Sequence, residues 1–169
     1  MKPEEDVWHS ASPQFDVSSE HLDVWRIPLN HDGRTLEYST VLSPDEVARR
    51  SGVSAAGVWD IEKCEGDLTC CYSPRDVQQF CRVLAIRPIE LFADEVAEPP
   101  VSAAQLARHI HEECRSRGIT LEQFEDAVGW RLSACIEPPE RLLEDMTIVG
   151  LQWLCRELGI DWHRVILSL

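Results

Sequence analysis

Two histidines and a cysteine at close spacing, His109, His111 and Cys114, are residue types that bind transition metals. On a helix, residues 109 and 111 point about 200° apart, so only His111 and Cys114 share a face. Two ligands do not complete a zinc site, which requires four. We therefore expect no metal ion here, but a solvated helix face beside a core cysteine.

A second group of thiols, Cys64, Cys70 and Cys71, lacks the paired two-residue spacing of a zinc module. We interpret this stretch as a loop whose thiols lie in the core. The chain has 7 cysteines in all, an odd number without regular spacing, which favours the reducing cytoplasm over a disulfide framework.

Residues that would carry catalysis are not grouped in any recognisable pattern. The sequence has no glycine-rich phosphate loop and no Gly-x-Ser-x-Gly motif. Paired acids such as Glu112-Glu113 and Glu144-Asp145 are typical of solvated helix faces. We expect a protein that is not an enzyme and that binds no cofactor or metal.

The charge is strongly acidic, with 30 Asp and Glu against 16 Lys and Arg and a net charge of −14. The excess is spread along the chain and no segment forms a basic tail, which disfavours tight non-specific binding to DNA. The first residues hold no apolar run and no stretch reaches transmembrane length, so we expect a cytoplasmic protein with no membrane contact.

Capping patterns predict a chain of short helices from residue 43 onward. A hydroxyl is followed three residues later by an acid or amide at Ser43, Ser73, Ser102 and Thr120. At each place the hydroxyl can accept a free backbone N–H and the later side chain can bond back to the cap.

Before these helices, residues 1–40 lack helical periodicity. Apolar and polar residues alternate on both sides of His31-Asp32-Gly33, which predicts a β-hairpin that packs on the helices or pairs with a second chain. Further along, the prolines and acids of residues 94–102 mark a domain boundary. We divide the chain into 1–40, 41–96 and 101–169.

The two helical parts resemble each other. Ser43 and Thr120 each start a helix that ends nine residues later at a glycine, Gly52 or Gly129, an offset of 77. The apolar pattern of residues 73–86 then matches that of residues 147–160 at an offset of 74. This pattern predicts two related modules in tandem.

Residues 42–92 resemble the Cro- and lambda-repressor-like helix-turn-helix family, also called the XRE family. The resemblance is carried by the Ser43 cap, the Val47-Ala48 pair, the turn Gly52-Val53-Ser54, the core pair Val58 and Ile61, and Glu62. The second copy departs from the family: Glu125 stands where the family prefers alanine, Trp130-Arg131 replaces Val-Ser, and Pro138-Pro139 end the recognition helix after about one and a half turns. The resemblance implies a mainly α fold of tandem lambda-repressor-like helix-turn-helix modules, the second degenerate, with an N-terminal β-hairpin segment.

In this family the start of the recognition helix and of the preceding helix contact DNA. The positions that the resemblance assigns to DNA are Arg49, Arg50, Ser54, Ala55, Ala56, Trp59 and Lys63, and in the second copy Gln123 and Arg131. Residues that make bidentate base contacts are missing from the first helix start, and Trp59 is more easily explained by packing on residues 68–72.

Two functions follow from these observations. The first is an XRE-type transcriptional regulator that binds DNA weakly, through its tandem modules or as a homodimer joined by the hairpin. The alternative is an acidic protein-interaction module, an antirepressor or DNA mimic, that kept the fold and binds a basic protein partner. The charge over the first recognition helix distinguishes the two.

Overall fold

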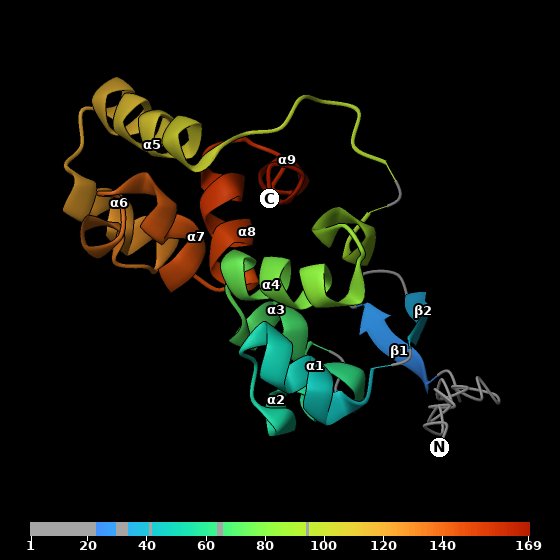
Figure 1. Cartoon of the computed structure of the whole chain (residues 1–169). Coiled ribbons are helices and arrows are strands. Elements are labelled where there is room, and N and C mark those ends of the chain that lie inside the picture. The colour runs from blue at the N-terminus through green and yellow to red at the C-terminus, as the bar shows by residue number, and fades with distance from the viewer. Residues whose placement is uncertain (1–22, 30–33, 41, 64–65, 94) are drawn as a thin grey trace, which may run out of the picture.

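The computed structural model describes residues 23–29, 34–40, 42–63, 66–93 and 95–169. The described chain is mainly helical, which confirms the expected class (Figure 1). Its helices, in chain order, are α1 (Pro44–Ser51), α2 (Ala55–Lys63), α3 (Asp67–Cys71), α4 (Pro74–Leu84), η1 (Pro88–Leu91), α5 (Ala103–Arg117), α6 (Leu121–Val128), η2 (Leu132–Ala134), η3 (Pro139–Arg141), α7 (Leu142–Asp145), α8 (Ile148–Glu157) and α9 (His163–Ile166).

Two antiparallel strands precede the helices, β1 (Asp23–Leu29) and β2 (Arg34–Thr40). Their register places Trp25 opposite Tyr38 and Ile27 opposite Leu36. Strand β1 lies beside α2, and the turn predicted at residues 31–33 lies outside the described residues.

The four predicted caps all start helices. The hydroxyls of Ser43, Ser73, Ser102 and Thr120 each accept the backbone N–H three residues later, at 3.2–3.3 Å. Three of them form complete capping boxes. The exception is α1, where the side chain of Glu46 bonds two arginines instead of returning to its cap. The helix starts are therefore confirmed, and one expected box is replaced by ion pairs.

The predicted helix ends are also confirmed. Gly52 ends α1 with φ of 78° and Gly129 ends α6 with φ of 73°, both left-handed. A residue with a side chain is disfavoured there. Each glycine turns the chain away from its helix, and each lies nine residues after the residue whose hydroxyl caps that helix.

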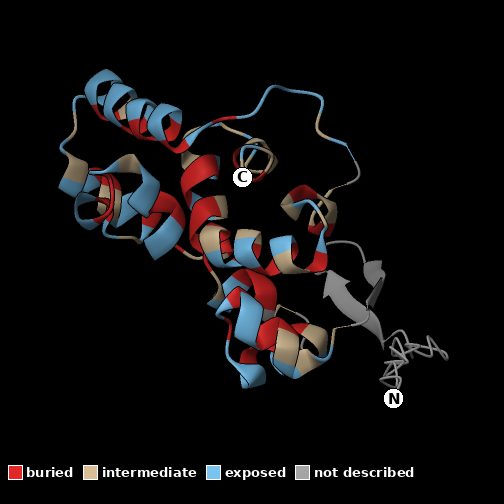
Figure 2. Ribbon diagram, in the orientation of Figure 1, coloured by how far each residue is buried: buried red, intermediate tan, exposed pale blue. Residues whose placement is uncertain are grey.

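Both helical parts contribute to one continuous hydrophobic core (Figure 2). Helix α3 packs on α8, α4 packs on α7, and η1 packs on α9. The backbone N–H of Ile148 donates to the carbonyl of Tyr72 at 3.0 Å, and the rings of Phe92 and Trp162 meet edge to face with centroids 5.2 Å apart.

These contacts between the halves have a reciprocal pattern. In chain order, α3 and α4 of the first half correspond to α7 and α8 of the second half. The contact of α3 with α8 therefore has its counterpart in the contact of α7 with α4. Reciprocal contacts of this kind are typical of a twofold arrangement. The connection over residues 95–102 is not helical and crosses from η1 to α5 (Figure 1).

Candidate functional site

Helix α2 holds the positions that the resemblance assigned to the recognition helix. The hydroxyl of Ser54 caps it by accepting the N–H of Gly57 at 3.0 Å. The predicted core pair, Val58 and Ile61, is fully buried. The opposite side is exposed to solvent and consists of Ser54, Ala55, Ala56, Trp59, Asp60 and Lys63. We call these six residues the α2 face.

A glycine inside α2 allows this helix to lie close to its neighbour. A Cβ at Gly57 would lie 2.2 Å from the hydroxyl of Tyr72 and 3.0 Å from Cγ1 of Val53. Glycine weakens a helix by about 1 kcal/mol relative to alanine. The close approach of Tyr72 explains why the helix nevertheless has glycine at this position.

Trp59 is exposed, with 57% of its surface open to solvent, so it is not a core residue, and its packing on residues 68–72 stays a prediction. The helix begins at Ala55, and its buried side is already occupied by Gly57, Val58 and Ile61, which turns residue 59 outward. The ammonium group of Lys63, one turn further on, lies 5.5 Å from the centre of the indole ring. Trp59 therefore forms an apolar prominence on the α2 face.

The arginines beside this face are engaged with an acid of their own helix. Nε and Nη2 of Arg49 donate to the two carboxylate oxygens of Glu46 at 2.8 and 2.6 Å. Nε of Arg50 donates to the same carboxylate. These hydrogen bonds lower the pKa of Glu46 from 4.5 to about 2. The two positive charges are thus partly balanced where DNA phosphates would have to bind.

The remaining cation of the α2 face is Lys63, whose ammonium lies 3.4 Å from the carboxylate of Glu62. The acids Asp45 and Asp60 are exposed on α1 and α2. From residue 44 to residue 63 the sequence holds 4 acids and 3 bases. The three predicted cationic contacts Arg49, Arg50 and Lys63 thus each lie within ion-pair distance of a carboxylate.

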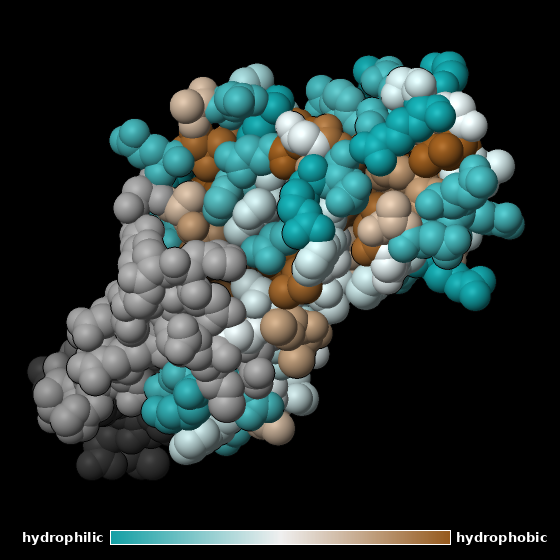
Figure 3. Space-filling view, turned by 180° about the vertical axis from the view of Figure 1, so that it is seen from behind, coloured by the Kyte–Doolittle hydropathy of each residue, from teal (hydrophilic) through white to brown (hydrophobic). Residues whose placement is uncertain are grey.

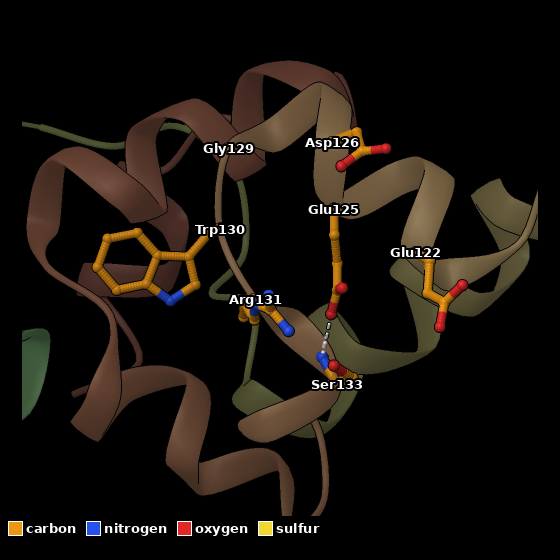
Figure 4. A pocket seen from close by; sticks show the side chains of 7 residues that line it. All are labelled: Glu122, Glu125, Asp126, Gly129, Trp130, Arg131 and Ser133. Carbon is orange, nitrogen blue, oxygen red and sulfur yellow. Dashed lines mark hydrogen bonds between the residues drawn. The ribbon is translucent and has the colours of Figure 1, made fainter.

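In the second half, one of the two predicted DNA contacts, Arg131, lines a pocket rich in acids. The pocket has a volume of about 530 Å³ (Figure 4). It is lined by Glu122, Glu125, Asp126, Gly129, Trp130, Arg131 and Ser133. Arg131 is exposed at this pocket, whereas the side-chain oxygen of Gln123 accepts the N–H of Thr120 at 2.9 Å. Gln123 is thus held in the capping box of α6.

Glu125 has a structural task that its position in the sequence did not reveal. Its carboxylate accepts the backbone N–H of Ser133, at the start of η2 (Figure 4). This hydrogen bond is the main cause that lowers the pKa of Glu125. The acid at residue 125 thus accepts a hydrogen bond from the short turn that follows α6.

The helical segment predicted after Gly129 is shorter than expected. Instead of one and a half turns, the chain forms the single 3-10 turn η2 before Pro138-Pro139. The ring of Trp130 points away from the acids of the pocket (Figure 4). A Cβ at Gly150 of α8 would lie 3.2 Å from that ring, so Trp130 packs where only glycine leaves room.

The thiols divide between core and surface. Cys81, Cys114, Cys135 and Cys155 are buried as expected, and burial raises the pKa of Cys81 and of Cys155 to about 12. Cys70 and Cys71 are exposed on α3, so their assignment to the core is wrong; Cys64 lies outside the described residues. Among the described residues no three His, Cys, Asp or Glu side chains are grouped as metal ligands.

One exposed aromatic side chain was missed by the sequence analysis. Trp153 is 47% exposed on α8, with the guanidinium of Arg156 3.7 Å from its ring centre. The helical periodicity of the sequence could have predicted this exposure, because Leu151, Leu154 and Cys155 lie on the buried side of α8 and residue 153 does not.

Comparisons of the chain with protein-family models, curated proteins and solved structures give no match. Within the described ranges, no helix combines the length and the apolar character needed to cross a bilayer.

Proposed function

We propose that the protein is a protein-interaction module on a helix-turn-helix scaffold, and that the α2 face binds a basic protein partner. This proposal depends on one observation, which is that the cations around the α2 face are paired with acids while its tryptophan is exposed. The nearby cations are engaged with Glu46 and Glu62, whereas Trp59 projects into solvent. This combination favours a protein surface over a phosphate backbone.

The paired cations beside the α2 face disfavour binding of DNA. Binding releases counterions when unpaired Lys and Arg neutralise phosphates. Arg49 and Arg50 would first have to leave Glu46, whose carboxylate would remain beside the phosphates. The net charge of −14 adds long-range repulsion of nucleic acid and attraction of a basic partner.

The exposed indole ring of Trp59 favours a protein partner. Tryptophan is among the residue types that contribute most of the binding free energy at protein interfaces. Such residues are usually surrounded by contacts that contribute little free energy themselves but exclude water. Ala55 and Ala56 lie one turn before it on the same exposed surface. A partner can therefore approach the helix closely and enclose the indole ring in a pocket.

The proposal includes two related helix-turn-helix modules after a hairpin segment, as the sequence predicts. Equivalent caps, equivalent left-handed glycines and the reciprocal contacts of α3, α4, α7 and α8 support this relation. In the second module η2 takes the place of α2, so the first module has the longer exposed helix.

The experiment compares three baits: the unchanged chain, Trp59→Ala, and Trp153→Ala as a matched control with a second exposed tryptophan. A partner retained from native cytoplasm is identified, purified and titrated against each bait. We expect a basic protein whose affinity falls at least about tenfold with Trp59→Ala, whose loss removes an interface anchor. Equal affinity for the Trp59→Ala bait would refute the assignment of the surface.

A DNA-binding transcriptional regulator is the second candidate. It is favoured by the exposure of the first turn of α2, where Ser54, Ala55 and Ala56 are open to solvent. It requires affinity that decreases steeply with salt and with neutralisation of Arg49, Arg50 or Lys63.

A further inference from the structure

A small hollow between α1 and α4 gathers arginines in this acidic protein. It has a volume of about 150 Å³. Its lining consists of Arg50, Arg75, Gln78, Gln79, Arg82 and Val83. The four polar residues of α4 are spaced by three or four positions, which places them on one side of the helix. The lining contains no carboxylate.

The guanidinium groups in this hollow differ in how far they are already paired. Arg50 donates through Nε to Glu46, and Arg75 donates to Gln78 Oε1 at 2.7 Å and lies 3.7 Å from a carboxylate oxygen of Glu144. Arg82 makes no ion pair with any described residue. Arg50 and Arg75 thus each have an acid partner, with Glu46 shared between Arg50 and Arg49, and Arg82 has none among the described residues.

The shape and chemistry indicate the class of ligand. Drug-sized molecules occupy pockets of about 300–1,000 Å³, so this hollow accommodates a smaller group. Arginine forks bind the oxygens of phosphate through paired hydrogen bonds, and the amide of Gln79 can supply a further neutral donor. Nε2 of Gln78, in contrast, already donates to the main-chain oxygen of Leu169. We propose that this hollow binds the phosphate group of a small anionic ligand, with Arg82 and Arg75 as its principal donors.

This site is separate from the α2 face and does not depend on the partner proposed above. Arg75, Gln78 and Arg82 belong to α4, whose buried side includes Phe80 and Cys81. Arg75 is 38% exposed and Arg82 is exposed, so both can be changed without opening the core.

The test is calorimetric titration with inorganic phosphate and with pyrophosphate at constant ionic strength. We expect saturable binding with one site and a dissociation constant of about 1 mM or lower for pyrophosphate. Arg82→Gln and Arg75→Gln should each weaken binding about tenfold, because each removes a charge-assisted hydrogen bond. Arg82→Lys should give an intermediate loss, since it keeps the charge without the fork. Arg108→Gln, on the exposed side of α5, is the matched control.

Three results would overturn the proposal. The first is no saturable heat up to about 10 mM pyrophosphate, ten times the expected constant. The second is unchanged affinity in both glutamine variants, each shown by circular dichroism to be folded. The third is binding of a short DNA duplex that depends on Arg82 without binding of free phosphate, which would assign the arginines to nucleic acid.

Discussion

At the scale of single residues, several charged side chains have partners within their own module. Glu46 holds two arginines of α1, and Glu125 caps the turn that replaces a recognition helix. In a DNA-binding module the arginines would be available to phosphates, and residue 125 would be small. These carboxylates therefore act within the fold, Glu46 by pairing with arginines and Glu125 by accepting the N–H of Ser133.

The first prediction concerns Glu46 and acid. Its folded pKa lies below its ordinary value of 4.5, at about 2, because the arginines stabilise the carboxylate. Its contribution to stability is therefore complete above pH 4.5 and disappears as the pH falls toward 2. We expect Glu46→Gln to melt at a lower temperature than the unchanged chain at pH 7 and at the same temperature near pH 2.

Thermal unfolding followed by circular dichroism at several pH values measures this difference. Asp45→Asn is the control, since Asp45 is an exposed acid of the same helix turn. A melting difference for Glu46→Gln that stays constant from pH 7 down to about 2 would show that the ion pairs do not contribute.

At the scale of elements, the decisive contrast is between α2 and η2. Both follow a helix that ends at a left-handed glycine. However, α2 is an α-helix of 9 residues, whereas η2 is a 3-10 turn of 3 residues. Pro138-Pro139 limit the second, Trp130 turns toward Gly150, and Glu125 caps what remains. The two segments thus follow equivalent left-handed glycines but present different surfaces.

The second prediction tests the cap of η2. Glu125→Ala leaves the N–H of Ser133 without its acceptor and should lower the free energy of unfolding by about 1 kcal/mol, allowing for solvent exposure. Glu125→Gln keeps an acceptor oxygen and should lose less. Urea unfolding measures both variants, with Glu122→Ala of the same pocket as the control. Equal stability of the Glu125→Ala and Glu122→Ala variants would remove the capping role.

The sequence predicted the elements better than the surface. The hydroxyl caps, Gly52 and Gly129 act within four or five residues of their partners, so local patterns sufficed. The bond from Ser133 to Glu125 and the cluster around Arg82 depend on how separate segments meet. Amphipathic spacing describes which side of a helix is buried, and it does not reveal which exposed charges find each other.

At the scale of the whole molecule, the two halves share a core, although the loop at residues 95–102 separates them in sequence. The side opposite the view of Figure 1 shows separate hydrophobic patches among hydrophilic side chains (Figure 3). The reciprocal packing of α3 on α8 and of α4 on α7 links the halves as two copies would be linked in a dimer.

The third prediction follows from this shared core. Trp162→Ala removes the ring that meets Phe92 across the halves and should lower the free energy of unfolding by about 2 kcal/mol, since Trp162 is only partly buried. Hydrogen exchange should report lower protection in both residues 66–93 and residues 101–169. Trp153→Ala, an exposed position, should change stability by about 0.5 kcal/mol or less. Loss of protection in the second half alone would mean that the halves unfold independently.

The most direct measurement is a gel-shift titration with a random pool of duplex DNA at low salt, using purified protein up to micromolar concentration. Because the cations at α2 are balanced by Glu46 and Glu62, we expect no retarded band at concentrations where a DNA-binding module would shift the pool. A shift that is lost on adding salt and on changing Arg49, Arg50 and Lys63 to glutamine would contradict the assignment of the α2 face to a protein partner.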